Sequence, residues 1–319
     1  MDNIYAINDI ERGCAVTVGM FDGVHLGHRH ILDLLQRQAR ERGLVPVVVT
    51  FDRHPRVVLG SDAEHFRTLS ALQGRRTGGH SIAATDAYEV VLPFDHELAR
   101  LSACQFVRSY LVERMNMRLL VLGYDNVFGN RAANDFDLLP RLAGELGFGI
   151  VEDTAVEWDG AAVSSTRIRR ALAEGDMAGA NAMLGRAYTV EGTVVEGRHV
   201  GRRLGFPTAN LQPCDPLQAL PREGVYAARA VVDGTAWTAM ASLGPQPTFG
   251  CDAPTLEVHL LGSPGDLYGR RMQLSFVHRM RDIVRFDSPD ALAAQLAEDS
   301  RQARALLQRP DGGKGDVRP

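Results

Sequence analysis

Two closely spaced histidines, His25 and His28, lie in a segment that reads GMFDGVHLGH from Gly19 to His28. Imidazole N–H groups donate hydrogen bonds to phosphate oxygens, and Gly19, Gly23 and Gly27 let a backbone approach a ligand closely. The segment follows a short apolar run and precedes a helical pattern, whose free N–H groups and dipole favour anions. This setting favours a phosphate site over two surface histidines in a glycine-rich turn.

A second candidate anion site begins at Ser164, where the sequence reads SSTRIRR. Hydroxyl groups at a helix start can cap the helix or hold a phosphate, and Arg167 and Arg169 would add charged donors. Alone, the segment is more typical of a capped, solvated basic helix. Together with the HxGH pattern, it predicts the second half of a nucleotidylyl-transferase site.

Two loops are expected to line the same pocket, because each follows a predicted strand. They read GYDNVFG over residues 123–129 and TFDRHP over residues 50–55. In a parallel sheet the carboxyl ends of the strands share one edge, where ligands bind. For any single residue in the TFDRHP loop, a plain strand-end loop is an equally good interpretation.

The most distinctive segment of the second half reads GRRLGFPTAN from Gly201 to Asn210. Gly201 and Gly205 would make a loop that folds over phosphates. Thr208 and Asn210 carry the oxygen donors that suit Mg²⁺ with bound phosphates. The alternative is a hairpin loop that contains a proline turn.

Residues 255–261 read TLEVHLL and alternate as a strand does, so that Thr255, Glu257 and His259 share one face. A solvated polar face is the usual explanation of such a pattern. Glu257 is alternatively a general base that accepts a hydroxyl proton during phosphoryl transfer.

The elements of the first half alternate between strand and helix. This order predicts a doubly wound parallel sheet with helices on both faces, and the apolar run at 45–51 is typical of a strand covered on both sides. Strands are expected at 14–19, 45–51, 88–94 and 119–123, and helices at 28–42, 102–115 and 136–146.

The pattern changes near Gly185 to closely spaced strands, which predicts a small antiparallel barrel or sandwich. Asp233-Gly234 indicates a type I′ hairpin, and Ser288-Pro289 marks the start of a last helix. The expected strands are 190–196, 225–232, 235–242, 255–261 and 272–277. We therefore expect domains at 1–185 and 186–308, and a disordered tail at 309–319 that is rich in glycine and charge.

The composition indicates which partners, metal motifs and cellular location to expect. The 319 residues carry a net charge of −4 and a pI near 6.2, which argues against a chain-wide nucleic-acid surface and favours small-molecule partners. None of the four cysteines has CxxC spacing, so no zinc or redox motif is indicated. The sequence shows neither a signal-peptide pattern nor an apolar run long enough for a membrane span, so we expect a cytoplasmic protein without membrane partners.

The combined motifs resemble the prokaryotic bifunctional riboflavin kinase/FAD synthetase family. The resemblance extends from about Thr17 to about Leu307. The motifs that carry it are TVGMFDGVHLGH, GYDNVFG, VSSTRIR, LGRAYTVEGTVVEG, GRRLGFPTAN, GVYAA, GPQPTFG, LEVHLL, DLYG and the RDIVRF segment before the last helix. It implies an N-terminal FMN adenylyltransferase of nucleotidylyl-transferase (Rossmann-like) fold and a C-terminal riboflavin kinase β-barrel. Such an enzyme phosphorylates riboflavin to FMN with one ATP and adenylylates FMN to FAD with a second.

The resemblance also implies roles for individual residues. His28 and Arg167 would serve adenylyl transfer, and Glu257 would be the base for the riboflavin 5′-hydroxyl. Thr208 and Asn210 would hold Mg²⁺ with ATP. Asp125, Phe128 and Arg281 would contact the flavin, with Arg281 in a loop that closes over it. ATP and phosphate contacts would come from Gly19, Phe21, Asp22, Gly23, His25, Gly27, His28, Ser164, Ser165, Thr166, Arg167, Gly201, Arg202 and Gly205.

Three alternatives remain beside this interpretation. The first is a riboflavin kinase with a degenerate first domain, suggested by Val127, where related GYDxRFG sequences are often basic. The second is a tRNA-charging enzyme, which the acidic balance and short chain oppose. The third is a non-catalytic flavin-binding regulator, which would need neither magnesium-binding nor base residues.

Overall fold

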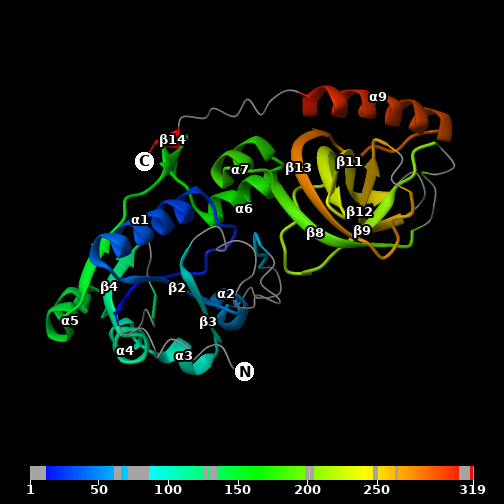
Figure 1. Cartoon of the computed structure of the whole chain (residues 1–319). Helices are drawn as coiled ribbons and strands as arrows, with labels where there is room; N and C mark the ends of the chain where they lie inside the picture. Colours follow the sequence, from blue (N-terminus) through cyan, green and yellow to red (C-terminus); the bar gives the residue numbers. More distant parts are fainter. Residues whose placement is uncertain are drawn as a thin grey trace. The chain divides into compact units, whose positions relative to one another are not determined.

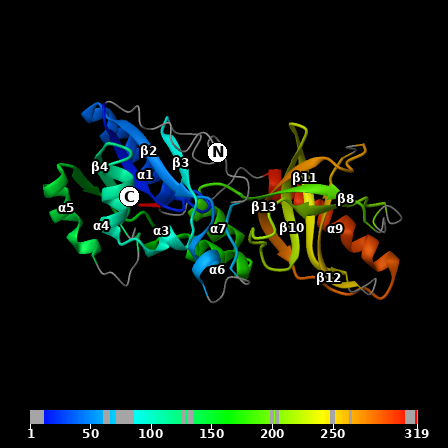
Figure 2. The same cartoon turned by 90° about the horizontal axis from the view of Figure 1, so that it is seen from below.

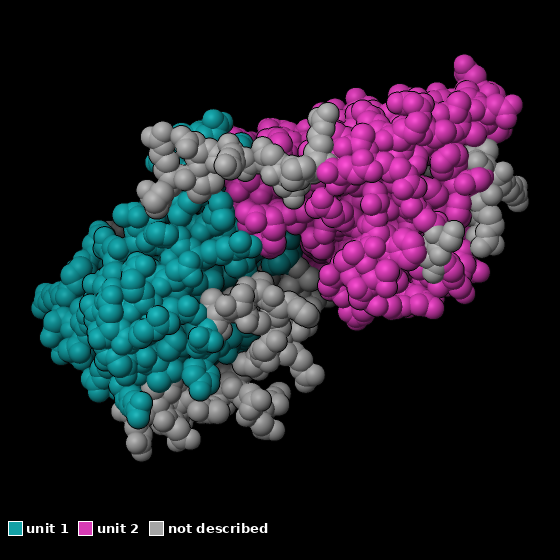
Figure 3. Space-filling model, turned by 45° about the horizontal axis from the view of Figure 1, so that its top comes forward, with its two compact units in different colours: residues 1–164, 316–319 teal, residues 165–315 magenta. Residues whose placement is uncertain are grey.

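The computed structural model describes residues 12–60, 66–70, 86–124, 128–129, 135–197, 201, 205–246, 251–262, 265–308 and 317–318. The chain divides into two compact units, residues 1–164 with 316–319, and residues 165–315 (Figure 3). Each unit is described by itself below. The predicted domain boundary after residue 185 and the predicted disordered tail stay predictions, although the contact-based division falls earlier, after Ser164.

The first unit is built on a five-stranded parallel sheet in the order β3-β2-β1-β4-β5. Every second residue of β1 faces one side, so Val16 and Val18 enter one core cluster and Ala15 the other. Burial on both faces explains the near-continuous apolar sequences of the central strands. The strands are β1 (Cys14–Val18), β2 (Val45–Phe51), β3 (Tyr88–Leu92), β4 (Met117–Leu122) and β5 (Gly149–Glu152).

Helices cover both faces of this sheet, as predicted (Figure 1). Ile31 and Leu35 of α1 pack against one face, and Phe106, Leu111 and Leu139 pack against the other. The helices are α1 (Leu26–Arg42), α2 (Pro55–Leu59), α3 (His96–Arg100), α4 (Ala103–Phe106), the π-helical η2 (Val107–Val112), the 3₁₀ turn η4 (Phe136–Leu138) and α5 (Leu139–Leu146). A small antiparallel sheet adds β6 (Glu157–Trp158), β7 (Ala161–Ala162) and β14 (Val317–Arg318).

The helix expected over 102–115 begins as predicted but changes its winding. Ser102 and Gln105 form the capping box that the sequence indicates. The chain then widens into the π-helix η2, where the Ser109 hydroxyl donates to the carbonyl of Gln105 at 2.7 Å. A side-chain bond of this kind competes with the helix backbone.

The second unit is a closed six-stranded barrel in the order β10-β11-β12-β9-β8-β13. Tyr226 and Phe276 fill its interior with ring centroids 5.1 Å apart. The Asp233-Gly234 hairpin is confirmed: both residues have positive φ, at 49° and 77°. The strands are β8 (Tyr188–Val195), β9 (Ala209–Pro213), β10 (Gly224–Val232), β11 (Thr235–Gln246), β12 (Cys251–Leu260) and β13 (Arg271–Arg281).

Among the described residues, the helices that accompany the barrel include α6 (Ser165–Glu174), α7 (Met177–Leu184) and α9 (Pro289–Gln308). The α9 helix lies along the outside of the barrel and buries Ala303 and Leu307 there (Figures 1 and 2). The side chain of Asn181 on α7 donates to the carbonyl of Phe276 and accepts from the amide of Tyr188, which ties the helix pair to the barrel. Among the helices in the described ranges, none is long and apolar enough to cross a membrane.

Candidate active sites

The two histidines of the HxGH pattern are brought together at the start of α1. His25 is the N-cap, and its Nδ1 accepts the amide of His28 at 3.3 Å. The two imidazole rings are stacked, with centroids 3.6 Å apart and an angle of 17° between the planes. The arrangement places both rings at the N-terminus of a 17-residue helix, where the helix dipole favours anions.

The turn before these histidines has an unusual backbone. Phe21 and Val24 adopt positive φ values of 46° and 38°, which few non-glycine residues adopt, and Gly23 lies at 83°. The carboxylate of buried Asp22 accepts the amide of Leu69 at 2.8 Å and the amide of Ser70 at 3.1 Å. These bonds fix the turn from a distant part of the chain.

The glycines of this turn lie close to neighbouring side chains. A Cβ on Gly23 would lie 2.9 Å from the side chain of Leu69, and one on Gly27 would lie 3.3 Å from the His25 ring. A Cβ on Gly19 would lie 3.2 Å from the ring of Phe21. The glycines therefore make room for neighbouring side chains, and their contacts with a ligand stay a prediction.

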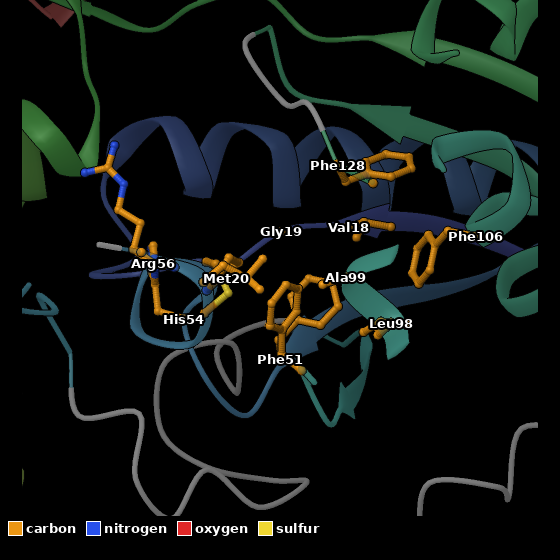
Figure 4. A pocket seen from close by; sticks show the side chains of 15 residues that line it. Val18, Gly19, Met20, Phe51, His54, Arg56, Leu98, Ala99, Phe106 and Phe128 are labelled. Carbon is orange, nitrogen blue, oxygen red and sulfur yellow. The ribbon is translucent and has the colours of Figure 1, made fainter. Parts of the chain in front are cut away.

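A mainly apolar cavity of about 550 Å³ opens beside this turn (Figure 4). Its walls come from separate segments of the first unit, and they include Gly19, Met20, Phe51, Leu98, Phe106 and Phe128. Phe106 and Phe128 meet edge to face, with ring centroids 5.8 Å apart. His54 and Arg56 also line the cavity, and the guanidinium of Arg56 points away from the aromatic cluster in Figure 4.

Sequence reasoning found only part of this cavity. Phe128 was expected there and lines it, whereas Asp125 lies outside the described residues. The TFDRHP loop was expected at this edge, and its residues Phe51 and His54 line the wall. Leu98 and Phe106 were missed, because helices that cover a sheet carry no local sign of the cavity that they close.

The segment SSTRIRR starts a helix, as expected. Ser165, Thr166 and Arg167 open α6, and its buried residues are Ile168, Ala171 and Leu172. The division between the two units falls between Ser164 and Ser165. The joining of this helix start with His28 in one site therefore stays a prediction.

In the second unit, cross-strand pairing aligns the predicted kinase residues. Asn210 on β9 is paired with Glu257 on β12, which is paired with Ser242 on β11. Val225 on β10 continues this row and is paired with Arg281 on β13. Leu256 and Val258 point into the barrel, so the row lies on its outer face. A carboxylate and an amide are thus neighbours on adjacent strands.

The segment before Asn210 is held by a histidine that sequence reasoning assigned to a polar face. His259 donates from Nδ1 to the carbonyl of Pro207 at 2.7 Å, and its ring meets Phe206 edge to face at 5.4 Å. Burial lowers the pKa of His259, although the bond to Pro207 acts in the opposite direction. A neutral His259 therefore holds the backbone of Pro207, the residue before Thr208.

The remaining residues of this predicted phosphate loop are only partly described. The amide of Phe206 donates to the carbonyl of Gly201 at 2.8 Å, so these two residues lie side by side. Gly205 has a φ of 80°, which suits a glycine in a turn. Arg202 lies outside the described residues.

A second cavity, of about 600 Å³, adjoins Thr208. Pro207, Val258, Asp266, Leu267 and Tyr268 contribute to its walls. Tyr268 belongs to the DLYG motif and is 42% exposed, so an aromatic ring is available at the edge of this cavity.

Arg281 lies at the end of a strand, whereas the resemblance implies a position in a loop. It is the last residue of β13, and its guanidinium makes a two-pronged ion pair with the fully buried Asp299 of α9, at 2.7 Å between Nη2 and Oδ2. Contact with a flavin stays a prediction for this residue. Among the described residues, no group of three or more histidines, cysteines or acidic residues has the arrangement of a metal site.

Two family models match the chain. The FAD synthetase model matches residues 7–167, and the riboflavin kinase model matches residues 184–307. A crystal structure titled "Macrolide-efflux Protein" from Streptococcus pneumoniae is 29% identical and has a TM-score of 0.77, covering 94% of this chain and 97% of that one.

Curated relatives agree with the family models. The bifunctional riboflavin kinase/FMN adenylyltransferase of Pseudomonas fluorescens is 38% identical over 92% of this chain and 93% of its own length. The protein of the same name from Escherichia coli K12 is 36% identical over 93% and 94%. The resemblance and the fold class predicted from the sequence are thereby confirmed, and the chain belongs to the bifunctional riboflavin kinase/FMN adenylyltransferase family of transferases.

Proposed function

We propose that this protein converts riboflavin to FMN with one ATP and FMN to FAD with a second ATP. The observation that carries the proposal is that each unit has polar side chains suited to binding phosphate and, in addition, a cavity of its own. The first unit sets a stacked histidine pair beside an apolar cavity. The second unit sets Glu257 beside Asn210, and Thr208 at the wall of another cavity.

The kinase step is assigned to the outer face of the barrel. Glu257 accepts the proton of the riboflavin 5′-hydroxyl, whose oxygen then attacks the γ-phosphorus of ATP as ADP leaves. Asn210 is the cross-strand neighbour of Glu257, and it binds the phosphate groups of ATP together with Mg²⁺. The cavity beside Thr208 has the size for a nucleoside, with Tyr268 at its edge.

Magnesium belongs to this proposal, and the donor set fits it. Mg²⁺ is usually held by one or two protein oxygens together with phosphates and water. The hydroxyl of Thr208 and the amide oxygen of Asn210 supply such donors, and the carboxylate of Glu257 lies on the adjacent strand. When bound, the ion would neutralise charge on the transferred phosphoryl group.

The adenylyl step is assigned to the first unit. The FMN phosphate attacks the α-phosphorus of ATP, and pyrophosphate leaves in line. His25, His28 and the N-terminus of α1 stabilise the charge on the phosphate oxygens. The flavin ring lies in the 550 Å³ cavity, against aromatic side chains such as Phe128. Arg167, together with Ser164, Ser165 and Thr166, adds donors from the start of α6.

A kinase with a degenerate first domain is not favoured, because the FAD synthetase model matches residues 7–167 and the HxGH pair is intact. Since both steps consume ATP, we also propose that the protein works in the cytoplasm.

The test is to incubate the purified protein with riboflavin, ATP and Mg²⁺ and to separate the flavins by chromatography over time. FMN should appear first and FAD afterwards, and FMN supplied alone with ATP should yield FAD. Formation of FMN with no FAD from either substrate would contradict the adenylyl step. Formation of neither would contradict the whole proposal.

A further inference from the structure

The backbone amides at the start of α4 are bonded to three side chains. The amide of Ser102 donates to the side chain of Gln105 at 3.0 Å, and the amide of Gln105 donates to the hydroxyl of Ser102 at 3.2 Å. The carboxylate of Asp135 accepts the amide of Ala103 at 3.0 Å and that of Cys104 at 3.2 Å. The four amides that a helix start leaves without a helical partner are therefore all bonded here, two of them to Asp135.

The carboxylate of Asp135 is charged at neutral pH. Burial opposes this charge, but hydrogen bonds from Ser102, Cys104 and Ala103 outweigh burial and lower the pKa of Asp135 below its ordinary value. The thiol of Cys104 also donates to the backbone carbonyl of Asp135 at 3.3 Å. Hydrogen bonds to an ionised group are stronger than neutral ones, so Asp135 links its own segment firmly to α4.

Gly129 meets the same helix start through its backbone. Its φ of 82° lies in the region that favours glycine. A Cβ at this position would lie 2.5 Å from the amide nitrogen of Ala103 and 2.7 Å from its Cα. This close approach places the neighbouring residue, Phe128, beside the start of α4.

Phe128 lies between two aromatic rings whose positions depend on these contacts. The ring of Phe106, the last residue of α4, meets it edge to face with centroids 5.8 Å apart, and the ring of Phe136 does so at 5.4 Å. Phe106 and Phe128 line the 550 Å³ cavity and lie close together at one side of it (Figure 4). The described residues that line this cavity do not include Asp135, so it acts on the cavity through its neighbours.

We infer that Asp135 is a positioning residue for FMN in adenylyl transfer: its carboxylate holds α4 and Phe136 together, so that Phe106 and Phe128 present a fixed aromatic wall to the flavin ring. The inference rests on the proposed adenylyl step. It assigns Asp135 no contact with either substrate. Binding of FMN therefore depends on this carboxylate, whereas binding of ATP does not.

The first test replaces Asp135→Asn, which keeps the size of the side chain, removes its charge and turns an N–H donor towards one of the two amides. Asp137→Asn is the matched control, since Asp137 is an exposed residue of η4 that lies next to Phe136 in the chain. The KM for FMN, the KM for ATP and kcat are measured for FAD formation from supplied FMN. Riboflavin phosphorylation by the same samples reports whether the protein is folded.

Asp135→Asn should raise the KM for FMN about tenfold, the scale of one charged hydrogen bond. The KM for ATP and the rate of riboflavin phosphorylation should stay near wild type, and Asp137→Asn should match wild type in every measurement. If Asp135 only stabilises the fold, the variant will contain less active protein with an unchanged KM for FMN. That result would overturn the inference, and so would an equal rise in the KM for ATP.

Phe136→Leu is a second test that leaves the hydrogen bonds of Asp135 in place, in case Asp135→Asn fails to fold. It removes the ring that meets Phe128 and should raise the KM for FMN about two- to tenfold, the scale of one aromatic pair, at an unchanged KM for ATP. A wild-type KM for FMN in Phe136→Leu would overturn the inference. Failure of the wild-type protein to make FAD from FMN would instead overturn the proposed adenylyl step itself.

Discussion

The close approach of Gly197 to Asn210 yields a sharp prediction for the kinase step. A Cβ added at Gly197 would overlap the amide nitrogen of Asn210 and lie 2.8 Å from its Cγ. Ordinary carbon–carbon contact begins near 3.5 Å, so Gly197→Ala would push the Asn210 side chain away by about 0.7 Å or more. A displacement near 1 Å can reduce catalysis about 100-fold, so we expect kcat for FMN formation to fall about 10- to 100-fold.

The assay compares FMN formation from riboflavin with FAD formation from supplied FMN, which should stay at the wild-type rate. Gly144→Ala is the control, since Gly144 lies in α5 with no atom within 4 Å of an added Cβ. A wild-type kcat and a wild-type KM for ATP in Gly197→Ala would refute the argument that the position of Asn210 matters to phosphoryl transfer.

Three further predictions follow from the two sites and from one buried thiol. Glu257→Gln should reduce FMN formation about 10²- to 10⁴-fold and still adenylylate supplied FMN, whereas His28→Ala should accumulate FMN. A mixture of the two variants should restore the synthesis of FAD from riboflavin. Loss of both steps in His28→Ala would contradict the assignment of the two reactions to separate sites. Arg167→Ala should weaken FAD formation by about 1.5–3 kcal/mol with little change in riboflavin phosphorylation, and equal loss of both activities would count against its assignment. Burial raises the pKa of Cys14 to about 12 against the opposing charge of Arg118, so iodoacetamide followed by mass spectrometry should label the exposed Cys214 and spare Cys14 in the native protein. Since the unfolded thiol ionises near pH 9, the stability that Cys14 contributes should be lost as the pH rises from about 9 towards 12, and a denaturation midpoint independent of pH in that range would contradict this.

The sequence alone determined the local features of this protein. The apolar run at 45–51 specified a strand buried on both faces, and Asp233-Gly234 specified a two-residue hairpin, because each depends on the conformational preferences of a few adjacent residues. The HxGH pattern was readable for the same reason: a cap residue and the helix that it starts are neighbours in the chain. The motifs in combination then identified the family.

Only the tertiary structure decided which distant residues meet. Leu69 and Ser70 bind Asp22 across a long separation in the chain, and Phe51 and Phe106 share a cavity wall although they belong to different elements. The row from Asn210 to Arg281 depends on the register of four strand pairs, and a slip of one residue in any of them would turn side chains to the other face. Packing of the whole chain sets such registers, and no short segment contains the information that would fix them.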